Sequence, residues 1–359
     1  MAVKRKPKFL LKFIIFIFIL LLLAGASLLT WNYMLSPVDK TSKADIEVVI
    51  PSGSGVDKIA SILEEKHLIR NKYVFKIYMK LNSKGTLKAS TYNLKKSMSV
   101  EEIANILEKG NNYNPDSIKI TFKEGSRITD YILLIAQETN HTPEEVRDVM
   151  VDKEYIESLV NKYWFLTEEI LNPDIYYPLE GYLFPDTYYF VNKDVEIEKI
   201  IETMLDQMED NLKDYKNKIG QNIHKYVTMA SIVELEGKRE EDRKMIVGVF
   251  NNRLAKGMNL GSDVTTYYAL QYPMTSDLTQ AQFATDNPYN TRADNMAGKL
   301  PVGPICNPSI MSIDASINPT ANDYYYFVAD KNAKIYYTKT LQEHNAKVEE
   351  LKKNGDWIW

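Results

Sequence analysis

The chain has 359 residues, 45% of them hydrophobic and 26% charged, which is typical of folded domains rather than of a disordered or fibrous protein. Its single cysteine, Cys306, excludes an intramolecular disulfide framework and cysteine-rich metal sites, and its four histidines are too scattered to predict a multi-histidine site. The net charge of −4 includes five basic residues and no acid among the first twelve positions. The remainder therefore holds 39 basic against 48 acidic side chains, which argues against a nucleic-acid-binding body.

The first predicted element is a transmembrane helix over residues 13–33. Residues 13–30 carry no charge, and Trp31 and Tyr33 follow as interfacial aromatic residues. Basic residues precede this stretch, and no positive charge follows it until Lys40. The positive-inside rule then predicts a cytoplasmic tail over 1–12 and an extracytoplasmic body anchored to the cytoplasmic membrane.

A cleaved signal peptide is the alternative to a retained anchor. The tripeptide Ala24-Gly25-Ala26 resembles a signal-peptidase site. However, Leu28 and Leu29 extend the apolar run beyond that site, which favours retention. The body lies outside the cytoplasm in either case.

A polar linker over 34–45 leads to a small predicted α+β domain over 46–114. Ser99 and Glu102 have the spacing of a helix capping box, and Gly110 fits the helix stop. The predicted elements are a strand at 46–50, a turn at 51–55, helices at 57–66 and 71–81, a strand at 90–94 and a helix at 99–107. The strand, Gly-Ser turn and helix of 49–56 return at 121–128, which we interpret as a repeated structural unit without catalytic residues.

The rest of the chain, 115–355, predicts a second and larger domain of mixed α+β class. Thr142 and Pro143 are a helix start signal, and Gly257 fits a helix stop. The predicted elements are a helical stretch at 142–172, helices at 194–217, 221–236 and 239–256, strands at 324–329 and 333–337, and a final helix at 341–353.

The sequence has no G-x-S-x-G, Ser-x-x-Lys or H-E-x-x-H motif, so carboxylates are the candidate catalytic groups. Glu234 falls on the apolar stripe of the helix at 221–236, beside the small residues Ala230 and Ser231, which leave room for a ligand. Apolar walls raise the pKa of a carboxyl, which suits a general acid. The alternative is a structural glutamate near the helix end that reaches solvent or Lys238, and spacing alone leaves both open.

Three further clusters place tyrosine, carboxylate and amide side chains in loops, a combination that suits sugar binding. Packing of aromatic-rich loops would give the same pattern, so each cluster alone is ambiguous. The candidate substrate-binding residues are Glu180, Tyr182, Asp186 and Tyr188 in the first, Ser262 and Asp263 in the second, and Tyr289 and Asn290 in the third.

At these clusters the chain resembles the YceG-like endolytic murein transglycosylases. The similarity runs from about 117 to 350, and the anchor and the small domain, which is LysM-like, fit the same family. The matching stretches are LEGYLFPDTY at 179–188, ASIVELEG at 230–237, VFNNRLAKGMNLGSDVTTYYAL at 249–270, NPYNTR at 287–292, LPVGPICNPS at 300–309 and YYYFVADKNAKIYYTKTLQEHN at 324–345. Val302 departs from the family's common LPPGPI pattern.

The resemblance implies that Glu234 is the catalytic residue, with no cofactor and no metal. It implies cleavage of the β-1,4 bond between N-acetylmuramic acid and N-acetylglucosamine, with a 1,6-anhydromuramic end as product. Glu234 would first protonate the glycosidic oxygen and then take the proton of the muramic C6 hydroxyl. The implied partners are peptidoglycan strands, the cytoplasmic membrane and the peptidoglycan synthases or division machinery. The implied role is to end the elongation of nascent strands.

Two other functions stay open at this point. A hydrolase of the same bond would need a second carboxylate at a set distance from the first, and Glu180, Asp186 and Asp263 are candidates. A non-enzymatic wall-binding scaffold of the division apparatus would keep Glu234 without using it.

Overall fold

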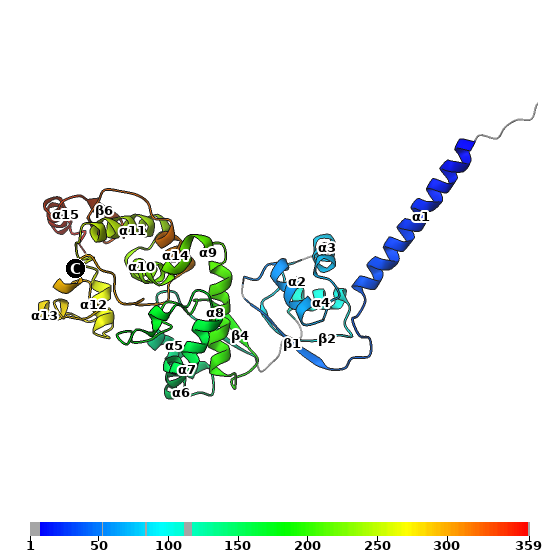
Figure 1. Ribbon diagram of the computed structural model, residues 1–359, viewed down its shortest axis with the longest axis horizontal. Helices are drawn as coiled ribbons and strands as arrows, with labels where there is room; N and C mark the ends of the chain where they lie inside the picture. Colours follow the sequence, from blue (N-terminus) through cyan, green and yellow to red (C-terminus); the bar gives the residue numbers. More distant parts are fainter. Residues whose placement is uncertain (1–7, 52, 83–84, 111–116, 358–359) are drawn as a thin grey trace, which may run out of the picture. The chain divides into compact units, whose positions relative to one another are not determined.

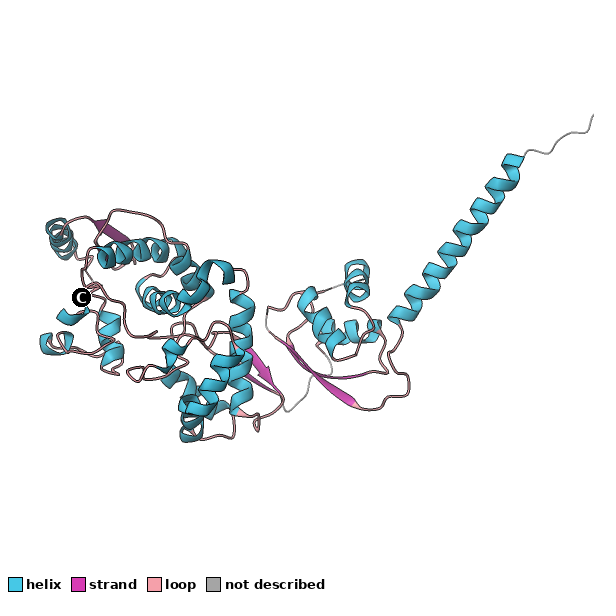
Figure 2. Cartoon of the chain, viewed as in Figure 1, coloured by secondary structure: helices cyan, strands magenta, loops and turns pink. Residues whose placement is uncertain are grey.

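The computed structural model describes residues 8–357 except 52, 83–84 and 111–116 (Figure 1). It divides into unit 1, formed by Met1–Lys119 and Thr187–Lys193, and unit 2, formed by Ile120–Asp186 and Asp194–Trp359. Most of the predicted basic tail and the predicted boundary at 114/115 lie outside the described residues. Both units contain helices and short strands, which confirms the mixed α+β class (Figure 2).

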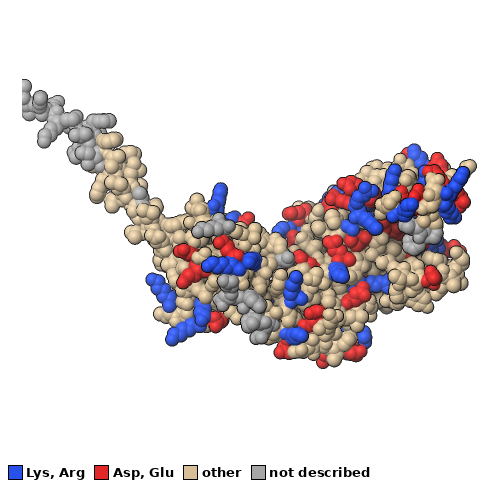
Figure 3. Space-filling model, turned by 180° about the vertical axis from the view of Figure 1, so that it is seen from behind, with Lys and Arg blue, Asp and Glu red and all other residues tan. Residues whose placement is uncertain are grey.

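Unit 1 begins with a long apolar helix, followed by a small folded body. Its segment Ile15–Leu35 is long and apolar enough to cross a membrane, and Figure 3 shows no charged side chain over the described part of this segment. The elements of unit 1 are α1 (Lys8–Leu35), β1 (Asp45–Ile50), α2 (Val56–Glu65), α3 (Lys72–Asn82), β2 (Ser90–Lys95), α4 (Val100–Lys109) and β4 (Thr187–Phe190). The helices and strands predicted between residues 46 and 107 are confirmed.

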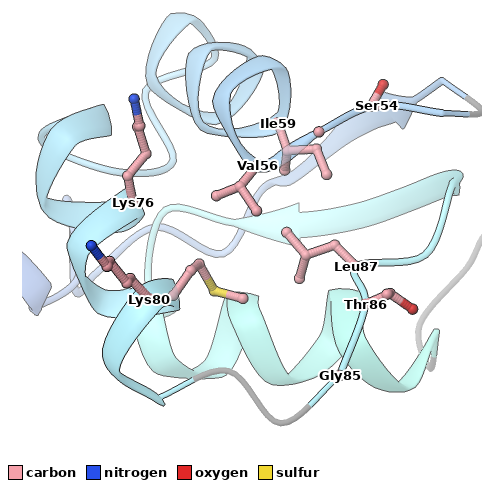
Figure 4. A pocket seen from close by; sticks show the side chains of 10 residues that line it. Ser54, Val56, Ile59, Lys76, Lys80, Gly85, Thr86 and Leu87 are labelled. Carbon is pink, nitrogen blue, oxygen red and sulfur yellow. The ribbon is translucent and has the colours of Figure 1, made fainter.

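The body of unit 1 packs its helices on a two-stranded antiparallel sheet. β1 pairs with β2 in the register Asp45↔Lys95 to Ile50↔Ser90. The predicted capping box of α4 forms, because the Ser99 hydroxyl accepts from the Glu102 amide while the Glu102 carboxylate accepts from the Ser99 amide. A cavity of about 460 Å³ lies between α2, α3 and residues 85–87 (Figure 4).

Unit 2 is mainly helical. Strand β3 (Ile118–Thr121) leads into it. Its elements are α5 (Ile128–Glu138), α6 (Pro143–Val151), α7 (Lys153–Lys162), η1 (Glu168–Leu171), α8 (Ile197–Leu212), α9 (Lys216–Ile219), η2 (Gly220–Asn222), α10 (Ile223–Glu236), α11 (Glu240–Ala255), α12 (Asp263–Ala269), α13 (Gln280–Phe283), η3 (Asp294–Met296), α14 (Ile310–Ile317), β5 (Tyr326–Ala329), β6 (Ile335–Thr338) and α15 (Leu341–Asn354). Helices α10, α11 and α14 pack against one another, and α10 is buried along most of its length.

Two predicted helical stretches are divided in the structure. Within 142–172, Asp152 ends α6 and also caps α7, because its carboxylate accepts a hydrogen bond from the Tyr155 amide at 2.7 Å. Within 194–217, α8 stops at Leu212 and the short α9 follows. Both stretches have an apolar period that continues through the break, so only the local capping geometry reveals it.

The repeated strand–turn–helix pattern is confirmed in both places. The turns between β1 and α2 and between β3 and α5 each contain a glycine with φ +73°, Gly53 and Gly125. L-residues other than glycine rarely adopt this conformation, which explains why both copies carry glycine there.

Candidate functional site

The site is centred on Glu234, in the last turn of α10. The preceding residues Ser231, Ile232 and Val233 are fully buried, and the Glu234 side chain itself is only 6% exposed. Glu234 therefore lies on a buried face of α10, as its spacing predicted, and not on a solvent-exposed face. A carboxylate so far from bulk water needs partners within the protein.

Two residues from outside α10 supply those partners. Arg243 of α11, 7% exposed, donates from Nη2 to Glu234 Oε1 at 2.9 Å. Ser309, the N-cap of α14, donates to Oε2 from its amide at 2.9 Å and from its hydroxyl at 2.6 Å. Arg243 also donates to the Ser309 hydroxyl at 2.9 Å and to the Gly237 carbonyl at 2.8 Å. The carboxylate is thus fixed in one orientation by charge-assisted hydrogen bonds.

The space beside Ala230 and Ser231 is filled by protein, so the prediction that these small residues leave room for a ligand is wrong. The Ile305 amide donates to the Ser231 hydroxyl at 3.0 Å, and the Cys306 thiol donates to the Ser231 carbonyl at 3.2 Å. The small side chains of α10 allow residues 305–306 to pack directly against the helix. On another side, the turn at residues 123–126 lies next to the Glu234 side chain.

Residues 123–126 form a turn that packs against Glu234. The Gly125 amide donates to the Asn307 carbonyl at 2.8 Å, and the Asn307 amide donates to the Ser126 carbonyl at 2.9 Å. A Cβ placed on Gly125 would stand 3.6 Å from Glu234 Cγ and 3.3 Å from Leu235 Cδ2. The turn is therefore held at van der Waals distance from the candidate catalytic side chain.

The neighbouring residue of that turn, Glu124, brings a second carboxylate to this site. Partial burial and the nearby negative charge of Glu234 both raise the pKa of Glu124, while the guanidinium of Arg243 acts in the opposite direction. The three charges are therefore close enough to influence one another. Glu124 was not among the carboxylates predicted from the sequence to take part in the chemistry.

Glu180 lies in a separate buried cluster. Its carboxyl accepts from the Ile128 amide at the start of α5 at 3.0 Å, from the Tyr268 hydroxyl at 3.0 Å and from the Asn307 side-chain amide at 3.2 Å. Burial raises the pKa of Glu180 to about 8. Asn307 is bonded both to Glu180 and to the turn at Gly125, so Glu180 helps to hold the turn that packs against Glu234.

Three other predicted substrate-binding residues are buried and contact protein. The Tyr182 hydroxyl lies 2.8 Å from His224 Nδ1. The Asn290 side chain is bonded to the Thr266 hydroxyl and to two loop carbonyls. Tyr289 is fully buried, and among the described residues its hydroxyl has no hydrogen-bond partner. Asn290 and Tyr289 fix their loop to α12, whereas Tyr182 fixes the loop at 179–188 to α10.

The remaining predicted residues lie in three places. The Ser262 hydroxyl donates to Glu236 at 2.5 Å, and burial raises the pKa of that glutamate. Asp263, half exposed, pairs with Arg292. Asp186 accepts a backbone hydrogen bond from Phe122, and Tyr188 lies in β4, which belongs to unit 1.

Arg243, Ser309 and Glu124 were not predicted as site residues. Arg243 and Ser309 follow Glu234 by 9 and 75 residues; Ser309 ends the LPVGPICNPS stretch, but neither local pattern shows that the side chain bonds to the Glu234 carboxylate. The one sequence feature that points to Glu124 is its place beside the turn glycine of the repeat at 121–128. Within the described residues, no three His, Cys, Asp or Glu side chains converge as they would around a metal ion.

The fold and the cluster define a carboxylate-centred site within an α+β protein. The model of the YceG-like family matches residues 48–350, and the chain belongs to this family. The resemblance inferred from the motifs is confirmed, and the match also includes most of unit 1, well before the predicted start near 117.

Known proteins agree with this assignment. The chain is 36% identical over 328 residues to the endolytic murein transglycosylase of Bacillus subtilis, covering 90% of this chain and 89% of the relative. It is 35% identical to the protein of the same name from Streptococcus pneumoniae, covering 95% of this chain and 65% of the relative. A crystal structure of a YceG-like protein from Listeria monocytogenes superposes with a TM-score of 0.60 at 38% identity, covering 85% of this chain and all of that one.

Proposed function

We propose that this protein is an endolytic lytic transglycosylase that cleaves the bond between N-acetylmuramic acid and N-acetylglucosamine in peptidoglycan strands, leaving 1,6-anhydromuramic ends. The observation that carries the proposal is the single buried carboxylate of Glu234, oriented by Arg243 and Ser309. The names of the relatives support the same reaction. No cofactor is needed, because a proton donor and acceptor suffices for this chemistry.

Glu234 performs both proton transfers of the proposed mechanism. It first protonates the leaving glycosidic oxygen and becomes a carboxylate. The muramic C6 hydroxyl then attacks the anomeric carbon of the same sugar while Glu234 removes its proton, so no water is consumed. The hydrogen bonds from Arg243 and Ser309 orient the carboxyl group that takes part in both steps. One carboxyl changes from acid to base in the same way within retaining glycosidases.

The predicted substrate-binding residues have two proposed roles. Asp186 and Asp263 bind the glycan strand. The buried side chains fix the loops that carry them, since their polar groups are largely bonded within the protein or enclosed by it. This second group consists of Glu180, Tyr182, Tyr188, Ser262, Tyr289 and Asn290.

The second candidate is a hydrolase of the same bond, which the position of Glu124 favours. A hydrolase needs a second carboxylate to act as nucleophile or to place a water. Glu124 lies in the turn against Glu234 and interacts with its charge, whereas Glu180 is buried behind Asn307. Glu124 therefore takes the place of Glu180 among the candidate second carboxylates, beside Asp186 and Asp263.

Product mass separates the two reactions. The full-length protein in detergent is incubated with uncrosslinked glycan strands, and the products are read by mass spectrometry. Anhydro ends, one water lighter than reducing ends, are expected from the wild type and from Glu124→Gln, and no cleavage from Glu234→Gln. The exposed Glu241→Gln is the matched control and retains activity. Reducing ends that disappear in Glu124→Gln would establish the hydrolase, and cleavage by Glu234→Gln would overturn both readings.

The proposal includes retention of α1 as a single-pass anchor with a cytoplasmic N-terminus. Its apolar side chains are exposed along its length, for example Phe16 at 57%, Leu21 at 65% and Leu29 at 74%. This exposure supports a lipid environment over packing in a soluble core. The mass of the mature N-terminus tests retention against signal cleavage near Ala26.

Unit 1 is proposed to be a LysM-like domain, which the order β1–α2–α3–β2 and the antiparallel pairing of the two strands support. An anchored enzyme would reach new strands as they emerge from the membrane, so we include strand termination, in contact with synthases or division proteins, in the proposal.

A further inference from the structure

The outward face of α3 is apolar. Phe75 and Met79 point into the core of unit 1 and are at most 3% exposed. Tyr73, Ile77 and Leu81 follow one another at four-residue spacing on the opposite face and are 62%, 49% and 71% exposed. A surface helix normally places polar residues opposite its buried face. An apolar outward face therefore indicates a surface that contacts an apolar partner.

A row of lysines borders this apolar stripe. Lys72, Lys76 and Lys80 also repeat every four residues, on one side of Tyr73, Ile77 and Leu81. The ammonium groups of Lys72 and Lys76 each stand 5.7 Å from the centre of the Tyr73 ring. Lys76 and Lys80 are visible on neighbouring turns of α3 (Figure 4). An apolar face flanked by lysines is typical of helices that lie in the interface of a bilayer.

The start of α3 is fixed to the end of α1. The guanidinium of Arg70, two residues before α3, lies 4.4 Å from the centre of the Tyr33 ring. The same group donates to the carbonyls of Pro37 at 2.6 Å and Val38 at 3.2 Å, and Leu35 packs against the core of unit 1. Helices α1 and α3 are in contact. The stripe therefore begins beside Tyr33, where a membrane-spanning α1 would leave the lipid.

We propose that α3 is an interfacial helix that inserts Tyr73, Ile77 and Leu81 into the outer surface of the membrane that α1 spans. This inference rests on the proposed retention of α1 as an anchor. Lys72 and Lys76 also form ion pairs with Glu64 and Asp57 of unit 1, so Lys80 is the lysine of this row that contacts lipid phosphates, with the aliphatic stems of all three beside the apolar stripe. The attachment has two points instead of one, so unit 1 is held at the bilayer surface in a defined orientation.

Depth-dependent quenching tests this placement in the full-length protein. An environment-sensitive fluorophore is attached through Ile77→Cys, Leu22→Cys or Lys153→Cys, in liposomes of phosphatidylcholine and phosphatidylglycerol. Native Cys306 is fully buried and stays unlabelled. Lys153 of unit 2, with a side chain 83% exposed, is the solvent control, and Leu22 within α1 reports the anchor.

The expected result is a blue-shifted label at 77, quenched at least twofold by lipids spin-labelled near the headgroup and less by lipids labelled near the bilayer centre. The label at 22 shows the reverse order, and that at 153 is quenched by neither. Strong quenching at 22 with none at 77 would refute the inference while leaving the anchor intact, and absence of quenching at 22 would refute both. A blue shift at 77 without lipid quenching would identify a protein contact, such as a second copy of the chain, and also overturn the inference.

Discussion

Replacing Arg243 with methionine tests whether the Glu234 cluster is a tightly coupled unit. The substitution keeps an apolar stem of similar reach but removes the guanidinium bonded to Glu234 Oε1, at 2.9 Å between side chains that are 7% and 6% exposed. Removal of one partner of a buried ion pair typically costs about 3–5 kcal/mol, because the other charge is left uncompensated. Glu234 keeps both hydrogen bonds from Ser309, so we expect a loss near the lower end, about 3 kcal/mol.

The measurement is urea unfolding of the full-length protein in detergent, followed by the loss of helical circular dichroism. Arg239→Met is the matched control, since Arg239 forms an ion pair with Asp242 at the same 2.9 Å but is 64% exposed. Its loss should be far smaller, because solvent already screens that pair. Equal losses for the two variants would refute the reasoning.

A double-mutant cycle completes the test. In Glu234→Gln the charge that Arg243 neutralises is absent, so adding Arg243→Met to that background should cost less than it does in the wild type. The difference is expected in the range of about 0.5–3 kcal/mol that contacting residues show. Strict additivity would mean that the two side chains do not depend on each other.

Two further predictions concern the surroundings of the cluster. Gly125→Ala adds about 1–2 kcal/mol of strain at φ +73° and places a Cβ 3.3 Å from Leu235 Cδ2, which displaces the turn from Glu234, so strand cleavage should fall. Gly53→Ala, with the same φ and open space around its Cβ, should leave cleavage intact, and equal loss in both variants would contradict the packing argument. Burial raises the pKa of Glu180 to about 8 in the folded protein, from an ordinary 4.5 in the unfolded chain. Between these pH values the unfolded chain has lost the proton that the folded protein keeps, so the free energy of unfolding should fall by up to about 1.4 kcal/mol per pH unit. Glu180→Gln should flatten this decline in urea midpoints measured across the window, and an unchanged slope would refute the assignment.

Local sequence patterns were sufficient for most of the secondary structure. The capping box of α4, the turn glycines of the two repeats and the apolar period of α10 all act over a few residues, so their effects are visible in the sequence. The division between α6 and α7 was missed, because Asp152 caps one helix and ends another within a continuous apolar period.

The sequence by itself determined the family, the long apolar helix and the position of Glu234 on a buried helix. Each of these depends on residue type and short-range spacing. Only the tertiary structure decided what surrounds that carboxylate. Arg243, Ser309 and the turn at Gly125 come from three separate parts of the chain and meet at Glu234 only after folding. A pattern within one helix carries no information about which distant groups will neutralise its buried charge, and this is the physical reason why the site could be located but not described in advance.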